Sequence, residues 1–389
     1  MILLTGIYTI LTHSSGAVVD QKTNEPITKR TLRAEAFGAK GDGVSDDTKA
    51  LQMALDALHA GDTLTLETGK TYRHTDVLTV HVAGVRLTGP GTLLATNEAR
   101  SSVWIYADNV TVEGGLTIKM ATTTRRWDAY EQMKVRLSGH TGIKLRHITV
   151  DGSAAGGIYI GNACTNYLIE DVTVQNTRAD GIHNTGGSHN GVIRRPIIRN
   201  VGDDGVAVVS YERDGPPCHT ITVESPRFYG NVWGRAFSVV GGEDITFRDI
   251  YAENSNAAAV YIATEGEPWN TCASRRIHVL GGTLRNSNTS KTTDHGAVLV
   301  YSGRPGYAND DIEITNLFMT DTRPTASRQV GVLGDAHRVT LRNFSFTGGP
   351  DNLFSATAPA GQYNTVGWVR TTPVADHVGF TTQNDGASP

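Results

Sequence analysis

The stretch GGIYIGNACTNYLIEDVTVQNT, residues 156–177, is followed by DGIHNTGGSHNGVIRRPIIRNV, residues 180–201, which has the same order of parts. Each copy holds a small or turn-forming residue, a short apolar strand, a polar turn, a second strand rich in Ile and Val, and an Asn-rich turn. Four further copies begin at Asp204, Arg235, Ala258 and Gly296. The six starting points are 24, 24, 31, 23 and 38 residues apart, so a period near 24 recurs with insertions.

This period is typical of the coils of a parallel β-helix, because it comes with β-branched strands and without helical periodicity. One coil cannot bury its apolar side alone, so each coil must stack on the next at a strand spacing of about 4.8 Å. A propeller needs about 40–45 residues per blade, and a β-sandwich does not keep one phase over so many strands. We therefore predict an all-β fold, a single-stranded parallel β-helix.

The ends of such a stack expose unpaired strand edges that must be covered. Residues 45–58 predict a helix that caps the N-terminal end, with Ser45 or Asp46 as its N-cap. Its one-sided apolar stripe consists of Leu51, Ala54, Leu55 and Leu58. The domains we expect are an N-terminal arm or atypical signal segment over 1–33, a β-helix catalytic domain over 34–350, and a C-terminal cap and tail over 351–389.

The three cysteines support the same register. Cys164, Cys218 and Cys272 are spaced 54 residues apart, each just before a second strand on alternate coils. Two coils span about 10 Å, which exceeds the Cα separation of about 7 Å that a disulfide tolerates. We expect three free, structural thiols.

Composition and missing motifs exclude several classes of function. The net charge of −4, without a basic run, argues against a nucleic-acid partner. The chain has no run of 18 or more apolar residues, so we expect no membrane span. Zinc-protease, P-loop, nucleophile-elbow and EF-hand patterns are missing, and we expect neither a metal nor another cofactor.

Acidic residues recur at the starting position of the copies. Asp180 and Asp204 share that phase, which places their Cα atoms about one strand spacing apart, and Asp203 lies beside them. Three carboxylates at one spot repel and desolvate one another, which raises the pKa of at least one and separates an acid from a base, as glycoside hydrolysis requires. The alternative is that these Asp-Gly pairs are ordinary turn residues.

The segment EAFGAKGDGVSDDTKALQMALDAL, residues 35–58, resembles the N-terminal signature of the pectate-lyase-like superfamily of right-handed parallel β-helices, which includes polygalacturonases and many phage tailspikes. Asp180-Gly181 followed by Asp203-Asp204 resembles the pattern of the family 28 glycoside hydrolases, the polygalacturonases. This resemblance implies that Asp203 is the general acid, that Asp180 and Asp204 activate the attacking water, and that the reaction inverts the anomeric carbon.

The chain departs from that pattern in three places. Arg178-Ala179 stands where the family has Asn-Thr, and Gly234-Arg235-Ala236 stands where it has Gly-His-Gly. Tyr261-Ile262-Ala263 replaces the Arg-x-Lys pair that holds the uronate carboxylate in the family. We therefore expect a neutral or differently charged glycan rather than galacturonan. Arg235 either holds an aspartate ionised in place of the missing His or is a surface arginine paired with a nearby Asp.

Long insertions follow the first strand at one phase, at residues 211–219, 264–272 and 301–311, and a further insertion spans 122–132. We expect the first three to form a wall beside the carboxylates, since long loops in such folds often carry function. Their aromatic residues, for stacking on sugar rings or for plain packing, are Tyr211, Trp269, Tyr301, Tyr307 and, in the fourth insertion, Trp127. The predicted substrate-binding residues are His183, Tyr211, Arg235, Tyr261, Glu265, Trp269 and Tyr301. His183 is also a possible auxiliary base, and Glu265 is the alternative catalytic carboxylate if Asp203 points inward.

We predict a glycoside hydrolase that cleaves a polysaccharide with an aspartate triad. Two alternatives stay open, namely a calcium-dependent polysaccharide lyase with Arg235 or Arg178 as its base, and a non-catalytic glycan-binding β-helix such as part of a phage tailspike. Polymeric glycans lie outside cells, so we expect an extracellular protein, secreted or virion-associated. Such proteins are monomers or homotrimers.

Overall fold

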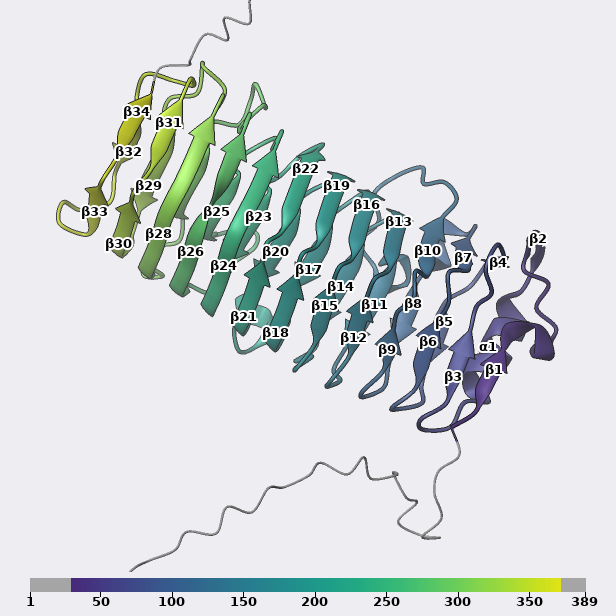
Figure 1. Ribbon diagram of the computed structural model, residues 1–389. Helices are drawn as coiled ribbons and strands as arrows, with labels where there is room; N and C mark the ends of the chain where they lie inside the picture. Colours follow the sequence, from purple (N-terminus) through teal and green to yellow (C-terminus); the bar gives the residue numbers. More distant parts are fainter. Residues whose placement is uncertain (1–28, 372–389) are drawn as a thin grey trace, which may run out of the picture.

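The structure, a computed structural model, describes residues 29–371 and is a right-handed parallel β-helix of stacked coils (Figure 1). Its coils rise from the N-terminal end, where the single α-helix α1 lies, to strands β32–β34 at the other end. The expected fold class is confirmed. The proposed signal segment lies outside the described residues, as do most of the arm over 1–33 and the last residues of the tail. In the part of the chain that the structure describes, no helix is both long and apolar enough to cross a membrane.

One face of the coil is a sheet of eleven parallel strands, each hydrogen-bonded to the next coil. From the N-terminal end, these strands are β5 (Leu78–Val80), β8 (Val103–Ile105), β11 (Val135–Ser138), β14 (Ile158–Gly161), β17 (Ile182–Asn184), β20 (Val206–Val209), β23 (Phe237–Val240), β25 (Val260–Thr264), β27 (Val298–Ser302), β29 (Val330–Gly334) and β32 (Phe354–Ala356).

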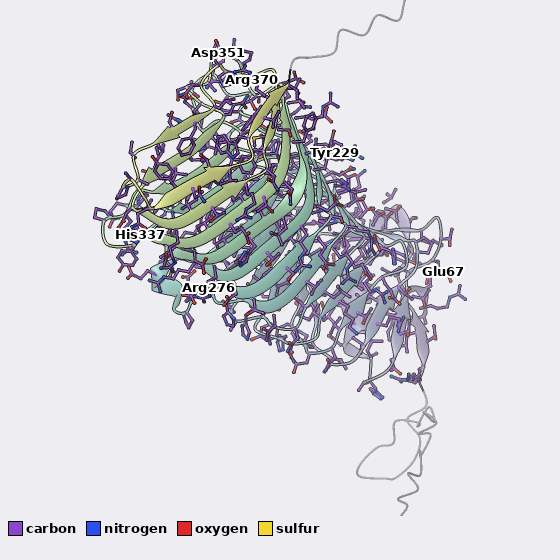
Figure 2. The ribbon with its side chains drawn as sticks, turned by 60° about the vertical axis from the view of Figure 1, so that its left-hand side comes forward. Glu67, Tyr229, Arg276, His337, Asp351 and Arg370 are labelled. Atoms are coloured by element: carbon purple, nitrogen blue, oxygen red, sulfur yellow. The ribbon has the colours of Figure 1, made fainter. Side chains whose placement is uncertain are left out.

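The other strands form two parallel ladders, which join in the 12-residue strands β24 (Gly242–Glu253), β26 (Ser274–Arg285) and β28 (Asn309–Thr320). The first ladder also holds β1 (Thr31–Arg33), β3 (Thr63–Thr65), β6 (Arg86–Thr88), β9 (Thr111–Val112), β12 (Lys144–Arg146), β15 (Leu168–Glu170), β18 (His189–Arg194), β21 (His219–Glu224), β30 (Ala336–Arg342) and β33 (Tyr363–Val366). The second also holds β2 (Asp42–Asp46), β4 (Thr71–His74), β7 (Thr92–Ala95), β10 (Thr117–Met120), β13 (Thr149–Ser153), β16 (Thr173–Thr177), β19 (Ile197–Val201), β22 (Arg227–Asn231), β31 (Ser345–Thr347) and β34 (Val369–Thr371). Side chains such as Arg276 and His337 point outward from the ribbon (Figure 2).

The register of the eleven-stranded sheet agrees with the repeat. Ile158 pairs with Ile182, which pairs in turn with Val206, and the same row continues on later coils. These side chains stack inside the coil and are fully buried, and each such side chain contributes roughly 1.5–3 kcal/mol relative to exposure. The Asn-rich turns stack as well, since Asn200 donates to the side-chain oxygen of Asn176 at 2.8 Å, and both have positive φ.

The two ends of the stack are closed by apolar groups. Helix α1 (Thr48–Asp56) buries Leu51, Ala54 and Leu55 against the first coils, and Asp47 rather than Ser45 or Asp46 precedes it. At the C-terminal end, Trp368 packs on Phe344, with ring centroids 5.2 Å apart. Among the described residues the cysteines are free, with Cys164 and Cys218 buried and Cys272 half-buried, as expected.

Candidate active site

The turns before β17, β20 and β23 place charged residues in one column. Asp180, Asp204 and Arg235 each precede a paired strand by two residues, so they occupy the same register on three successive coils. The backbone N–H of Gly181 donates to the carbonyl of Asp204 at 2.8 Å, and that of Gly205 donates to the carbonyl of Arg235 at 2.9 Å. A side chain at Gly205 would meet the ring of Phe228 within 2.4 Å. The glycine therefore lets the coil close while the adjacent Asp204 faces the other way.

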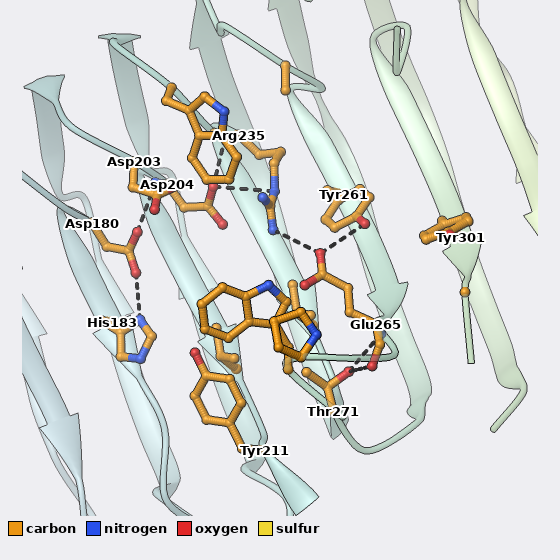
Figure 3. A pocket seen from close by; sticks show the side chains of 18 of the residues that line it. Asp180, His183, Asp203, Asp204, Tyr211, Arg235, Tyr261, Glu265, Thr271 and Tyr301 are labelled. Carbon is orange, nitrogen blue, oxygen red and sulfur yellow. Dashed lines mark hydrogen bonds and ion pairs between the residues drawn. The ribbon is translucent and has the colours of Figure 1, made fainter. Parts of the chain in front are cut away.

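Three carboxylates meet at this column, as predicted. Asp180, Asp203 and Asp204 each offer an oxygen atom, and these atoms lie within 4.8 Å of one another. Asp180 accepts from the backbone N–H of Asp204 at 2.9 Å and lies 2.5 Å from His183 Nδ1 (Figure 3). Asp204 accepts from the N–H of Arg235 at 2.7 Å and from Ser238 Oγ at 2.5 Å. These hydrogen bonds fix Asp180 and Asp204 and leave Asp203 as the member without a backbone donor.

The same contacts separate the pKa values of the three groups. Burial, with the charges of Asp180 and Asp204, raises the pKa of Asp203 to about 8. Burial would also raise the pKa of Asp180, but the hydrogen bond and charge of His183 outweigh it, and the pKa of Asp180 is lowered. For Asp204, burial prevails over the opposing charge of Arg235, and its pKa is raised. At neutral pH the site therefore holds a protonated Asp203 next to an ionised Asp180.

Arg235 links the carboxylates to the next coils. Its Nε lies 3.3 Å from Asp204 Oδ1, and its Nη2 lies 3.6 Å from Glu265 Oε1. Tyr261 donates to Glu265 Oε1 at 3.1 Å and lies under the guanidinium of Arg235, which is 4.4 Å from the ring centroid. Arg235 is thus a buried residue of the site, because only 11% of its side chain is exposed.

The carboxylates lie in a cleft of about 1040 Å³. The loops after β20 and β25 supply Tyr211 and Trp269 to its lining, as expected from the insertions, and Tyr301 comes from strand β27 itself. Tyr211 and Trp269 lie together, with ring centroids 6.3 Å apart, and half of Trp269 is exposed. All ten predicted catalytic and substrate-binding residues line this cleft.

Two aromatic residues of the insertions lie elsewhere. Tyr307 donates to Glu212 Oε1 at 2.6 Å and is not part of the cleft lining. Trp127 packs under Arg125, whose guanidinium lies 3.8 Å from the ring centroid. Both therefore contribute to loop packing.

Several residues of the cleft were not predicted. Arg126 reaches from the 122–132 insertion to Asp203, with its Nη1 2.8 Å from Asp203 Oδ2. Trp233 and His295 also line the cleft, and Ser238 bonds to Asp204. Trp233 lies two residues before Arg235, and His295 lies one residue before Gly296. Their positions beside the starting residues of two copies could therefore have indicated that they line the cleft. Nothing in the repeat indicates Arg126, because an insertion has no register.

The three aspartates are also the described residues that come nearest to a cation site. Two of them already accept hydrogen bonds from the backbone N–H groups of Asp204 and Arg235, and Asp203 is paired with Arg126. The proton on Asp203 and the guanidinium groups of Arg126 and Arg235 balance part of the carboxylate charge. This donor set fits an acid and base cluster better than an oxygen cage for Ca²⁺.

Several solved parallel β-helix structures superimpose on this chain. A polygalacturonase from Erwinia carotovora superimposes with a TM-score of 0.63 at 16% identity, covering 91% of this chain and all of that one. The A-module of the mannuronan C-5 epimerase AlgE4 of Azotobacter vinelandii gives 0.60 at 14% identity, covering 86% and 99%. An α-1,3-glucanase of glycoside hydrolase family 87 from Streptomyces thermodiastaticus gives 0.57 at 17% identity, covering 92% and 70%.

No curated protein matches the sequence. The model of the family described as rhamnogalacturonase A/epimerase, pectate lyase-like, matches residues 32–266, which is more than half of the chain. The matched range holds all three carboxylates, Arg235 and Glu265. The chain therefore belongs to the rhamnogalacturonase A/epimerase, pectate lyase-like family.

Proposed function

We propose that this protein is a glycoside hydrolase that cleaves a polysaccharide. The observation that carries the proposal is the pair of neighbouring carboxyl groups whose pKa values diverge, with that of Asp203 raised to about 8 and that of Asp180 lowered. Glycoside hydrolysis needs one carboxylic acid to protonate the leaving oxygen and one carboxylate on the other side of the reaction. The family and the fold neighbours support a polysaccharide as substrate.

In the proposed reaction Asp203 donates its proton to the glycosidic oxygen as the bond to the leaving sugar breaks. Asp180, kept ionised by His183, accepts a proton from the attacking water, and Asp204 assists by holding that water. Arg126 approaches only Asp203, so it supports the carboxylate that forms when the proton has left. Each proton movement then uses a group already in the required charge state at neutral pH.

The stereochemical course separates two versions of this mechanism. Inversion is the outcome that the resemblance to polygalacturonases implies. One oxygen of each carboxyl group, however, lies within 4.8 Å of one oxygen of the other two, whereas inverting pairs usually keep their carboxyl groups roughly 6.5–9.5 Å apart. NMR of the anomer formed first by the wild-type enzyme decides between inversion and retention.

The charge of the cleft supports a neutral sugar over a uronate. Its two arginines, Arg126 and Arg235, are already engaged by Asp203, Asp204 and Glu265. Three further acidic groups also line it, namely Asp128, Asp180 and Glu267. A uronate carboxylate would meet repulsion and no free guanidinium. We therefore propose a neutral polysaccharide rather than galacturonan, and an extracellular location, secreted or virion-associated, where such polymers occur.

The test is a screen of soluble polysaccharides, including arabinans, galactans, dextran, bacterial capsules and polygalacturonate, with product analysis. We expect new reducing ends from a neutral polymer, without the ultraviolet absorbance of an unsaturated uronate. That absorbance, together with loss of activity in EDTA, would instead identify a lyase. Retained glycan binding without any product would identify a non-catalytic binding protein, and either result would overturn the proposal.

A further inference from the structure

A second cavity of about 460 Å³ lies beyond the C-terminal ends of β14, β17 and β20, whereas the carboxylates precede β17 and β20, and it shares no lining residue with the first cleft. Its lining is aromatic and polar, and consists of Tyr130, Tyr159, Asn162, Ala163, Gly186, Gly187, His189, Asp214, Pro216 and His219. The proposed reaction uses none of these residues. The cavity therefore needs an explanation of its own.

Two stacked histidines form one side of this cavity. His189 of β18 pairs in register with His219 of β21, and the two rings are nearly parallel, at 16°, with centroids 4.6 Å apart. The Nδ1 atom of His189 contacts the carbonyl of Gly187 at 2.9 Å, and that of His219 contacts Thr220 Oγ1 at 3.1 Å. These contacts occupy one nitrogen of each ring and fix the orientation of both rings. The Nε2 atom of each ring then remains for a ligand.

Tyrosines form another part of the lining. Tyr130 packs edge to face on Tyr159, with centroids 5.4 Å apart, and 42% of Tyr130 is exposed. Aromatic surface beside fixed polar groups suits the apolar faces and hydroxyl edges of a sugar ring. Asp214 is the one Asp, Glu, Lys or Arg side chain in this lining, so the cavity offers no cationic partner for a uronate.

The cavity and the active-site cleft meet across one coil. Tyr159 of β14 lines the cavity, His183 of β17 lines the cleft, and these residues pair in register. Their rings are stacked, with centroids 5.7 Å apart and planes at 17°. The loop after β20 borders both spaces, because Tyr211 lines the cleft and Asp214 and Pro216 line the cavity. A polymer that crosses the strand row at Tyr159 and His183 passes from one space to the other.

We propose that this cavity binds additional neutral sugar units of the same polysaccharide, beyond the units that flank the cleaved bond. This inference rests on the proposed function and extends it to internal cleavage, because substrate must continue beyond the carboxylates. Short oligosaccharides would fill the cleft alone. Long chains would also fill the cavity and bind more tightly.

Binding is measured by affinity electrophoresis in gels that contain arabinan, galactan, dextran or polygalacturonate. All variants carry Asp203→Asn, so that binding is measured independently of cleavage. We expect at least one neutral polymer, and not polygalacturonate, to retard the Asp203→Asn protein. Adding His189→Ala and His219→Ala should weaken that retardation about tenfold, which is the effect of losing one or two good contacts.

His278→Ala is the matched control, because His278 lies on β26 away from both spaces and pairs with Glu313. Circular dichroism and thermal melting verify that the double-histidine variant is folded. A second variant, Tyr130→Ala, tests the aromatic part of the lining without touching a paired strand. Equal retardation of these variants and the control would overturn the proposed cavity function, as would retardation by polygalacturonate alone or by no polymer. Failure of hydrolysis would appear separately, as missing reducing ends from the wild-type protein.

Discussion

The same position of the coil is occupied very differently in the middle and at the flanks of the repeat. Asp180, Asp204 and Arg235 stand in the middle coils, whereas Gly156, Ala258 and Gly296 occupy that register on either side. The flanking residues show what the fold alone requires there, namely a small group at a tight turn. The middle coils place buried charges at the same point, which costs stability unless each charge is paired.

This difference separates what the fold contributes to the site from what the charged residues contribute. The strands and their buried rows are alike in the two regions, so the fold supplies spacing and orientation. The charged residues Asp180 and Asp204 bond to backbone N–H groups of the next coil, but the flanking coils stack with Gly or Ala at this position. The presence of the charged residues is explained by chemistry, and the clearest way to test this is to make the middle coils resemble the flanks.

The largest effect is expected from Asp203→Asn. Removing the proton donor should lower kcat on the polysaccharide found in the screen by roughly 10³-fold, in line with loss of an essential general acid. The control is Asp244→Asn, which changes a half-exposed aspartate of β24 that pairs with Arg276 and does not line the cleft, and it should keep wild-type activity. Turnover of Asp203→Asn near the wild-type rate would rule out the proposed acid.

The next effect is on stability, in Arg235→Ala, which copies the residue type found at Ala258. Asp204 would remain buried without its guanidinium partner, so the free energy of unfolding should fall by about 3 kcal/mol at pH 7. The loss should shrink toward pH 4, because the protonated Asp204 does not need a cation. Urea denaturation at the two pH values measures both.

Arg276→Ala is the comparison for that variant. Arg276 bonds to Asp244 and Glu243 on the outer surface and is 43% exposed, so its removal should cost less than about 1 kcal/mol. Equal losses in the two arginine variants would contradict the distinction between a buried functional pair and an exposed one.

A smaller effect, of opposite sign, is expected for the stability of Asp203→Asn. The pKa of Asp203 is about 8 in the folded protein against 3.8 for an ordinary aspartate, so the wild-type protein loses stability as the pH rises from about 4 to about 8. Asparagine has no charge to bury and escapes this loss. The variant should therefore be more stable at pH 8 by about 2 kcal/mol or more, the full pKa difference corresponding to about 5 kcal/mol, with little difference at pH 4. Equal melting temperatures at pH 8 would contradict the raised pKa.

The sequence predicts those features of the molecule that follow from a repeated length. The period near 24 places Asp180 above Asp204 and Arg235, and the structure keeps that register. The insertions place Tyr211 and Trp269 in the cleft because each loop leaves the eleven-stranded sheet at the same phase, and the register of β27 places Tyr301 beside them. Hydrogen bonds between coils impose this register, so counting residues along the sequence is sufficient to predict which side chains lie next to one another.

Contacts between an insertion and a coil cannot be predicted from the repeat. Arg126 meets Asp203 over a separation of 77 residues, and no period relates the two positions. The path of the 122–132 loop depends on packing such as that of Arg125 on Trp127, which only the folded chain shows. For the same reason, the sequence left open whether Trp127 stacks on a sugar or packs, and the structure shows it packed under Arg125 in its own loop.

The smallest expected effect concerns Arg126, the charged residue of the site that the coils do not supply. Arg126 lies 2.8 Å from Asp203 Oδ2, and its charge lowers the pKa of that carboxyl against the effect of burial. In Arg126→Gln the pKa of Asp203 should rise, and Asp203 should stay protonated to higher pH. The basic limb of the pH profile of kcat/KM should then move upward by roughly half to one pH unit, while the acid limb, set by Asp180 and Asp204, should move less. Arg125→Gln is the control, since Arg125 packs on Trp127 in the same loop. An unchanged basic limb in Arg126→Gln would show that Asp203 is not the titrating acid, even if Asp203→Asn is inactive.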